Sequence, residues 1–380
     1  MPFPAAGAIA RRRFIQLCGA GASAVAAPAW SQSRSIRIGS TFDGSSIEKD
    51  TGMDCFKGAQ ACFAGLNRAG GIGGAKVELV RADDQYKPEL SKSNALAFQA
   101  DGSMLGMISP LGTRTTASIM ETVKDMAVVG PFTGTASLRK ASPPNIFWVR
   151  ASYDAEIDKL IRTAVTLGQD RIALMHPRDA FGAAVLEAFQ RTMAEVKLQP
   201  AAIATIPNVS STEVEPAAQA LAKAQPQVVI MAVGGVAPLF LKALRAAGGL
   251  STVYGLSVAA SSSNLAAMGP LARGLGFSTL VPSPFAIKHE LVRRYQADMI
   301  ASGSKDYSLP SLEGYVNACV MAEGLRLAGN GVNRKSLIAA LDSITNLDLG
   351  GLVVRYGKGS RAGSSFVDVA VVGAGGKMLS

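Results

Sequence analysis

The amino-acid sequence predicts an α/β fold with two doubly wound lobes, each built on a parallel sheet. Along the chain, short apolar runs alternate with amphipathic segments, which is typical of consecutive βα units. The length of 380 residues exceeds the size at which one hydrophobic core stops growing, so two domains are favoured. Hydrophobic residues make up 48% of the chain and charged residues 17%, a balance that supplies a large core.

The apolar runs have the length and composition of buried strands. They span residues 36–41, 77–82, 105–109, 127–130, 147–150, 172–176, 202–206, 228–233 and 252–256. The amphipathic segments between them are expected to be helices, over residues 52–69, 92–99, 116–124, 156–167, 180–196, 214–224 and 237–247. The strands fall into two sets, residues 36–150 and residues from 171 onward, and each set predicts one lobe.

The pattern changes after residue 280. Pro282 and Pro284 predict an extended link, because proline fixes its own backbone and restricts the residue before it. Two long helices are expected next, at about 289–301 and 311–328. Strands at 352–356 and 366–372 then complete the chain.

The first 29 residues have the pattern of a signal peptide. Residues 11–13 are three arginines, a short weakly apolar stretch follows, and residues 27–29 read Ala-Pro-Ala, a cleavage site of small residues. A Sec leader fits, and so does a twin-arginine leader, because Phe14 and Ile15 follow the arginines. No later stretch reaches the roughly 18 apolar residues of a membrane span. We therefore expect an exported protein that is soluble in the periplasm after cleavage.

The net charge of +10 does not point to nucleic acid. Lysines and arginines are scattered, as in Lys76, Arg81 and Lys87, whereas nucleic-acid binders gather them into patches with stacking aromatic residues. We expect no nucleic-acid partner.

The cysteines predict neither a disulfide framework nor a metal site. Cys18 lies in the leader. Cys55 and Cys62 are seven residues apart on one expected helix, about 10 Å along its axis, which is too far for a disulfide. Cys319 stands alone in another apolar helix. We expect three buried free thiols in the mature chain, no metal and no cofactor.

Motifs for catalysis are incomplete. The glycines of 70–74 lack the spacing of a dinucleotide-binding loop and follow a helix, so they are expected to form a turn. Residues 255–259 begin like a nucleophile elbow around Ser257 but end in alanine, and His176 and His289 are the two histidines that could act as its base. We therefore expect a protein that is not an enzyme.

Several segments, taken in their order and spacing, resemble one protein family. They are Leu66–Gly74, Asp83-Asp84 with Pro88, Gly130-Pro131, Gln169–His176 and Phe181-Gly182. Over essentially all of the mature chain the sequence is similar to type I periplasmic binding proteins of the leucine/isoleucine/valine-binding class. The resemblance implies a small-molecule solute held in a cleft between two hinged lobes and delivered to an inner-membrane ABC permease. We expect the protein to be a monomer.

The resemblance also implies three crossovers between the lobes, near residues 151, 283 and 347. The first lobe would then hold residues 34–150 and 283–347, and the second lobe residues 151–282 and 348–378.

In that family, two loops of the first lobe hold the carboxylate of the ligand with hydroxyl and backbone N–H groups. Each matching loop here leads from a strand into a helix, where unpaired N–H groups and the helix dipole attract an anion. Simple N-capping by threonine explains the same pattern. The matching residues are Gly112, Thr113 and Arg114 in one loop and Thr133, Gly134 and Thr135 in the other. Opposite them, the second lobe is expected to present Tyr153, Phe181, Gly235 and Val258.

The expected solute is a carboxylate without an α-ammonium group. Amino-acid receptors of this class usually carry an acidic residue in the last of these loops, but residues 257–260 read Ser-Val-Ala-Ala. An ammonium group would be poorly paired in a desolvated cleft, which is costly, although Asp154 or Glu313 could take the place of the missing acid. Two alternatives stay open: a receptor for branched-chain amino acids and a ligand sensor of the same fold.

Overall fold

The computed structural model describes residues 1–2, 35–357, 360–374 and 378–379. Both lobes lie within residues 35–380. The signal peptide expected over residues 1–29 lies, apart from its first two residues, outside the described residues. Among the described helices, none combines the length and the apolar character needed to cross a bilayer.

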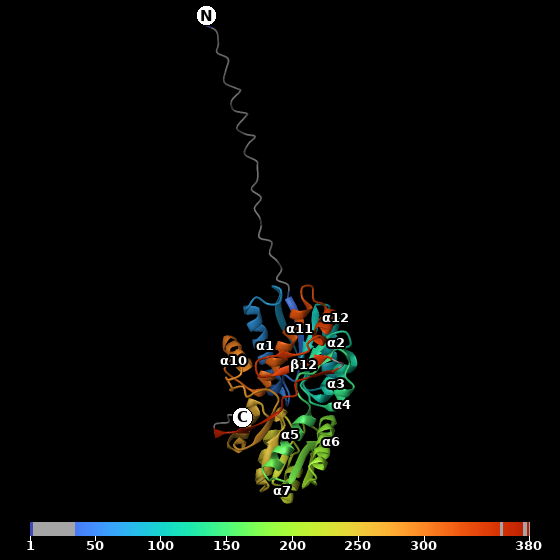
Figure 1. Cartoon of the computed structure of the whole chain (residues 1–380), viewed down its shortest axis with the longest axis vertical. Helices are drawn as coiled ribbons and strands as arrows, with labels where there is room; N and C mark the ends of the chain where they lie inside the picture. Colours follow the sequence, from blue (N-terminus) through green and yellow to red (C-terminus); the bar gives the residue numbers. More distant parts are fainter. Residues whose placement is uncertain (3–34, 358–359, 375–377, 380) are drawn as a thin grey trace. The chain divides into compact units, whose positions relative to one another are not determined.

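The first lobe, the upper part of the folded chain in Figure 1, holds a parallel sheet of five described strands in the order β2-β1-β3-β4-β5. They are β1 (Ser35–Phe42), β2 (Lys76–Asp83), β3 (Met104–Ile108), β4 (Ala127–Val129) and β5 (Ile146–Phe147). The helices of this lobe are α1 (Lys49–Arg68), α2 (Pro88–Ala100), α3 (Thr113–Thr122), α4 (Ala136–Lys140), α10 (Glu290–Ala301), α11 (Leu309–Ala328) and α12 (Arg334–Asp342).

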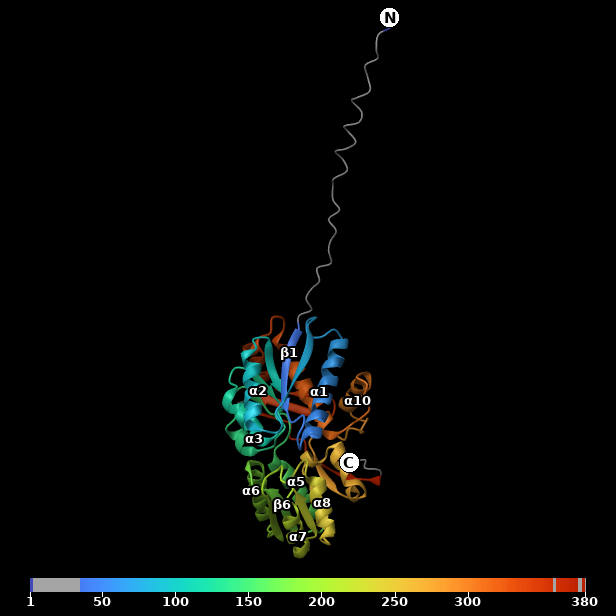
Figure 2. The ribbon, with the colours of Figure 1, turned by 180° about the vertical axis from the view of Figure 1, so that it is seen from behind.

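Helices cover both faces of this sheet because its strands are apolar on both sides. Successive residues of a strand point to opposite faces. In β4, Ala127 and Val129 belong to the core that includes residues of α1 and α11, whereas Val128 belongs to the core of α2 and α3. Figure 2 shows α1 on one side of β1 and the pair α2 and α3 on the other. The carboxyl ends of the strands are left free to carry loops toward the second lobe.

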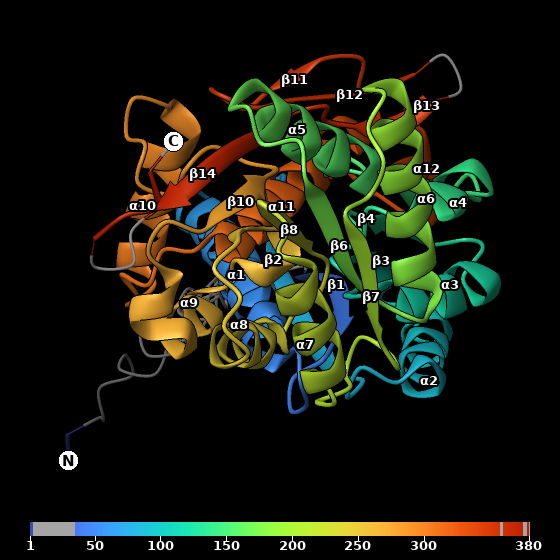
Figure 3. The ribbon, with the colours of Figure 1, turned by 90° about the horizontal axis from the view of Figure 1, so that it is seen from below.

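The second lobe holds a sheet of seven described strands in the order β15-β14-β10-β9-β8-β6-β7. Figure 3 shows β14, β10, β8, β6 and β7 of this sheet following one another. They are β6 (Ile172–Pro177), β7 (Ala202–Ile206), β8 (Val228–Met231), β9 (Thr252–Gly255), β10 (Gly276–Thr279), β14 (Asp368–Val372) and β15 (Met378–Leu379). The strands from β6 to β10 pair in parallel, and β14 and β15 extend the edge in antiparallel orientation.

The helices of the second lobe also form two layers. Val228 and Ile230 of β8 face the core of the first layer, and Val229 and Met231 face the core of the second. The first layer is α5 (Tyr153–Thr166) and α6 (Ala180–Glu195), and the second includes α7 (Glu215–Ala224), α8 (Ala237–Ala246) and α9 (Ser262–Met268). The fold class expected from the sequence, two lobes with doubly wound parallel sheets, is confirmed.

The chain passes from the first sheet to the second between β5 and β6, and it returns to the helices of the first lobe between β10 and α10. The third crossover was expected near residue 347 but lies at 364–367. Residues 347–363 instead form β11 (Leu347–Asp348), β12 (Val353–Gly357) and β13 (Ser360–Gly363). This hairpin stays on the first lobe, because the Trp148 N–H donates to the Arg361 carbonyl (3.0 Å) beside β5. Ser364 N–H then donates to the Val149 carbonyl (2.8 Å), so the first and third crossovers run side by side.

Candidate functional site

A pocket lies between the lobes at the carboxyl ends of their strands, where ligands bind in open α/β folds. Both lobes contribute to its lining, and the cavity that they leave between them has a volume of about 20 Å³. We call it the interlobe pocket. It is lined by Glu48, Thr51, Tyr86, Leu111, Gly112, Thr113 and Phe132 of the first lobe and by Tyr153, Phe181, Val209, Gly234 and Val258 of the second.

The first turn of α3 supplies unpaired backbone donors to this pocket. Gly112, the residue before α3, has φ +99°, and no side chain in the described residues caps the helix. The N–H groups that open a helix have no carbonyl partner within it, and the helix dipole is positive there. Gly112 and Thr113 both line the pocket, so this turn faces the place where a ligand would lie.

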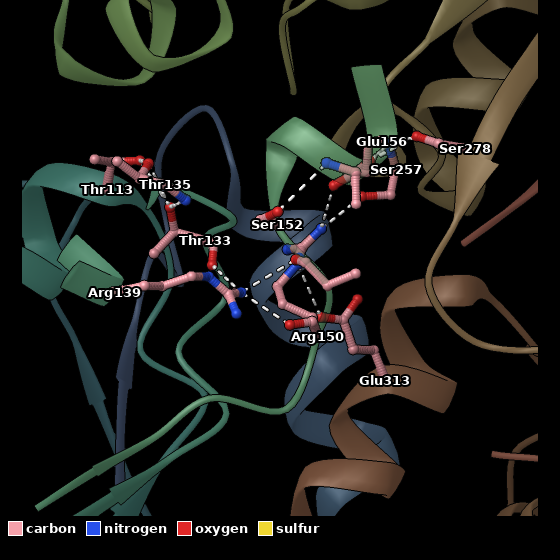
Figure 4. Close-up of polar contacts among 12 residues, drawn as sticks. Thr113, Thr133, Thr135, Arg139, Arg150, Ser152, Glu156, Ser257, Ser278 and Glu313 are labelled. Atoms are coloured by element: carbon pink, nitrogen blue, oxygen red, sulfur yellow. Dashed lines mark hydrogen bonds and ion pairs between the residues drawn. The ribbon is translucent and has the colours of Figure 1, made fainter. Parts of the chain in front are cut away.

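A buried triangle of threonine hydroxyls supports that turn (Figure 4). The Oγ1 atom of Thr113 lies 2.8 Å from that of Thr133 and 3.0 Å from that of Thr135, and the last two are 3.1 Å apart. Thr133 and Thr135 are almost fully buried and are absent from the described lining of the pocket. They therefore hold Thr113 in place from behind, whereas Thr113 itself reaches the pocket.

The other residues expected from the sequence fall into three groups. Gly112, Thr113, Tyr153, Phe181 and Val258 line the interlobe pocket together. Arg114 lines an adjoining outer pocket, which shares Tyr86, Thr113, Phe181 and Val209 with the first. Gly134 and Gly235 contribute through their backbones: the Gly134 carbonyl accepts from Tyr153 N–H (2.9 Å), and the Gly235 N–H donates to Glu48.

Glu48 is one of the residues of this site that were not predicted from the sequence. It lies in the loop between β1 and α1, is 4% exposed, and its Oε1 atom accepts a hydrogen bond of 2.7 Å from Gly235 N–H of the second lobe. Burial, together with the nearby Asp43 and Asp50, raises the pKa of Glu48 to about 7 against the lowering effect of the Gly235 and Thr51 hydrogen bonds. Its position just after the first strand is the signal that could have found it.

Tyr86 was missed as well. It has φ +59°, and its ring lies so near α3 that a Cβ atom on Gly112 would lie 2.7 Å from it. Burial, and then the nearby Glu48 carboxylate, raise the pKa of Tyr86 well above its usual value, so its hydroxyl stays a neutral donor.

Aromatic side chains form the apolar wall of the pocket. The rings of Tyr153 and Phe181 meet edge to face with centroids 4.9 Å apart, and Phe132 lies across from them in the first lobe. Behind this wall, the guanidinium of Arg150 lies 4.4 Å from the centre of the Phe132 ring and 5.8 Å from that of Tyr153. A buried positive charge therefore stands close to an otherwise apolar surface.

Arg150 also joins the two lobes at the first crossover (Figure 4). It contacts Glu156 (3.5 Å) and the Ser257 hydroxyl (2.5 Å) in the second lobe, and Glu313 (3.4 Å) of α11 in the first. Glu156 in turn accepts from the Ser278 hydroxyl (2.6 Å). Ser257, the serine of the incomplete elbow motif, thus belongs to this hinge network.

The two carboxylates that could have replaced the missing acidic residue do not reach the pocket. Asp154 pairs with Arg191 (2.5 Å) on the surface, and Glu313 pairs with Arg150 in the hinge. A larger, mainly apolar pocket lies elsewhere, lined by α9, Phe285, Tyr307 and the end of the chain. We assign the site to the interlobe pocket because polar groups of both lobes converge there. Within the described residues, no three His, Cys, Asp or Glu side chains are grouped to hold a metal.

The comparisons with known proteins agree with this architecture. A sequence profile of the periplasmic binding protein family matches residues 35–377. A possible leucine/isoleucine/valine-binding protein from Rhodopirellula baltica is 20% identical, with a TM-score of 0.86 over 92% of this chain and 97% of that chain. A substrate-binding periplasmic protein from Ralstonia solanacearum is 29% identical, with a TM-score of 0.82 over 90% and 99%.

A third similar structure is an ABC-transporter solute-binding protein from R. palustris in complex with benzoate. It is 16% identical, with a TM-score of 0.79 over 91% of this chain and 95% of that chain. No curated protein sequence matches the chain. Because the family profile spans nearly the whole of residues 35–380 and the two-lobed fold agrees with it, the chain belongs to the periplasmic binding protein family and has the type I fold.

Proposed function

We propose that the protein is the substrate-binding component of an ABC importer and captures a small carboxylate-bearing solute in the interlobe pocket. The observation that carries this proposal is the uncapped first turn of α3, which faces a pocket lined by both lobes. Export by the leader of residues 1–29 places the protein in the periplasm, where it meets its solute and its membrane permease. We propose no catalytic step.

The chemistry of the pocket suits an anion with an apolar body. Free N–H groups at the start of α3 and the Thr113 hydroxyl can donate to a carboxylate, as helix N-termini commonly do. Tyr153 and Phe181 then offer an aromatic surface to the rest of the solute. The benzoate complex of the R. palustris protein supports this ligand class.

Glu48 fits this solute when it is protonated. A neutral carboxyl group can donate a hydrogen bond to a ligand carboxylate, whereas an ionised one repels it. Burial raises the pKa of Glu48 to about 7, so the neutral form is well populated near neutrality. The preferred solute therefore carries a carboxylate and no α-ammonium group.

An amino acid is the second candidate, and Glu48 is the observation that favours it. An ionised Glu48 would pair with an ammonium group, a role for which the sequence offered no acidic residue in the loop of residues 257–260. The possible leucine/isoleucine/valine-binding protein from Rhodopirellula baltica is consistent with this alternative. The two candidates differ in the sign of their pH dependence, as described in the Discussion.

A thermal-shift screen of small carboxylates and amino acids tests the proposed function. A solute that binds only the native state raises the melting temperature by mass action. We expect Thr113→Val to weaken the best hit roughly 10- to 100-fold, because a hydrogen bond to a charged group is lost.

Thr116→Val is the matched control for this experiment. Thr116 lies on the same helix, is 1% exposed, and its hydroxyl has no partner in the described residues and does not line the pocket. Its replacement should leave the affinity unchanged. Equal effects of the two variants, or no shift with any solute of the screen, would count against the proposed site.

A further inference from the structure

Two cysteine thiols meet where α1 packs against α11. The Sγ atoms of Cys62 and Cys319 lie 3.5 Å apart, although 257 residues separate them in the sequence. The sequence analysis expected three buried thiols in the mature chain. Cys55 and Cys62 are buried, but Cys319 is half-buried and so within reach of a small reagent.

Glycines bring the two helix backbones together at this place. A Cβ atom on Gly58 would lie 1.7 Å from the Ser311 carbonyl oxygen, and one on Gly314 would lie 1.9 Å from the Cys55 carbonyl oxygen. Helix axes usually stay about 8–10 Å apart, and glycine allows a closer approach. A disulfide requires Cα atoms roughly 4.4–6.8 Å apart, so closely packed backbones are what a cross-link between helices needs.

Cys62 continues this line of contact. It lies four residues after Gly58, and residues four apart share one face of a helix. That face of α1 packs against α11, which carries Cys319 five residues after Gly314. Cys55, although on the same helix, belongs to a different cluster, with Phe42, Leu111 and Phe132 around it. The pair of Cys62 and Cys319 is thus separate from the third thiol.

We propose that Cys62 and Cys319 are a redox pair that forms a disulfide between α1 and α11. The oxidant is a disulfide of the surrounding medium, such as glutathione disulfide or a protein thiol oxidant. The Cys319 thiolate attacks one of its sulfurs, forms a mixed disulfide and releases one thiol. The Cys62 thiolate then attacks the Cys319 sulfur and releases the second thiol. Two protein thiols are oxidised, one disulfide is reduced to two thiols, and the released thiols take up both protons.

The cross-link would tie α1 to α11. It encloses residues 62–319, which include every strand of the second lobe except β14 and β15. Restricting so long a loop lowers the entropy of the unfolded chain and stabilises the native state. Oxidising compartments favour such bonds. The inference does not depend on which solute the interlobe pocket binds.

Peptide mapping of the purified protein tests the proposal. The protein is first reduced, then incubated with glutathione disulfide, alkylated and digested without reductant. We expect one peptide pair that links Cys62 to Cys319, about 2 Da lighter than the two free thiols, with Cys55 alkylated. Oxidation should raise the melting temperature by roughly 3–10 °C, and dithiothreitol should reverse the shift.

Serine variants separate the cross-link from other effects of oxidation. Cys62→Ser and Cys319→Ser should each abolish the rise in melting temperature, whereas Cys55→Ser should retain it. The wild-type mapping needs no variant, so a poorly folded variant does not affect the result. The proposal is overturned if Cys62 and Cys319 both remain alkylated at saturating oxidant, if Cys55 takes part, or if a stable glutathione adduct forms in place of the cross-link.

Discussion

Replacing Arg150 by methionine should lower the free energy of unfolding by about 3–5 kcal/mol, because the substitution leaves buried carboxylates without their cation. The Arg150 side chain is 2% exposed and lies against Glu156 and Glu313, which come from different lobes. Burial raises the pKa of Glu313 to about 7 even with the opposing effect of Arg150. Without the arginine, the Glu313 carboxyl group must take up a proton or stay charged without a cationic partner in the hinge.

Chemical denaturation at neutral pH measures this loss. Arg191→Met is the matched control, because Arg191 pairs with Asp154 (2.5 Å) where both side chains are partly exposed. Exposed pairs of this kind contribute at most about 1 kcal/mol. Adding Glu313→Gln to Arg150→Met should recover part of the stability, since one unpaired acid is removed. An Arg150 variant as stable as the Arg191 variant would show that the network does not hold the hinge.

The affinity of the protein for a carboxylate solute should fall about tenfold for each pH unit above 7, and Glu48→Gln should make it independent of pH over that range. The pKa of Glu48 is raised to about 7, so the carboxyl group is neutral below that pH and negative above it. A bound anion favours the neutral form and binds with uptake of a proton wherever the free carboxyl is ionised. Affinity is therefore highest below pH 7 and is lost as the pH rises.

Titration calorimetry between pH 6 and pH 8.5 checks the profile. Glu313→Gln is the control, because Glu313 also has a pKa raised to about 7 by burial but lies in the hinge and not in the lining of the pocket. It should leave the pH dependence in place. An amino-acid solute would reverse the sign, with affinity rising above pH 7 and abolished by Glu48→Gln. A Glu48→Gln profile identical to the wild type would remove Glu48 from the site.

The parts of the fold that follow from local pattern were predictable. Strands such as β6 and β8 are continuous apolar runs, as expected where helices cover both faces of a sheet. Strand β10 was not predicted, because Gly276–Thr279 is short and half of its residues are polar. Its burial comes from the parts of the fold that pack around it, which the local sequence does not reveal. Helix α12 was missed although Asn333 and Ser336 form a capping box at its start, a signal that sequence alone contains.

The site was predictable only where strand ends determine it. Gly112 and Thr113 lie in the loop and first turn that lead from β3 into α3, so their place in the cleft follows from the fold class. Thr133 and Thr135 have the same pattern but turn out to lie behind Thr113, which only tertiary packing decides. The contact of Glu48 with the second lobe is its hydrogen bond with Gly235, which lies 187 residues away in the sequence. The two thiols of the cysteine pair are 257 residues apart. Such contacts leave no periodic signal in one sequence.

Calorimetry on a matched pair of solutes distinguishes a receptor for plain carboxylates from a receptor for amino acids. The pair consists of the tightest carboxylate from the screen and its α-amino counterpart, for example isocaproate and leucine, at pH 7. The interlobe pocket offers carboxylate donors at α3 but leaves an ammonium group only a half-ionised Glu48 as its partner. We therefore predict that the plain carboxylate binds at least about tenfold more tightly than the amino acid, since a poorly paired buried charge is costly. Tighter binding of the amino acid, abolished by Glu48→Gln, would contradict the account and establish an amino-acid receptor instead.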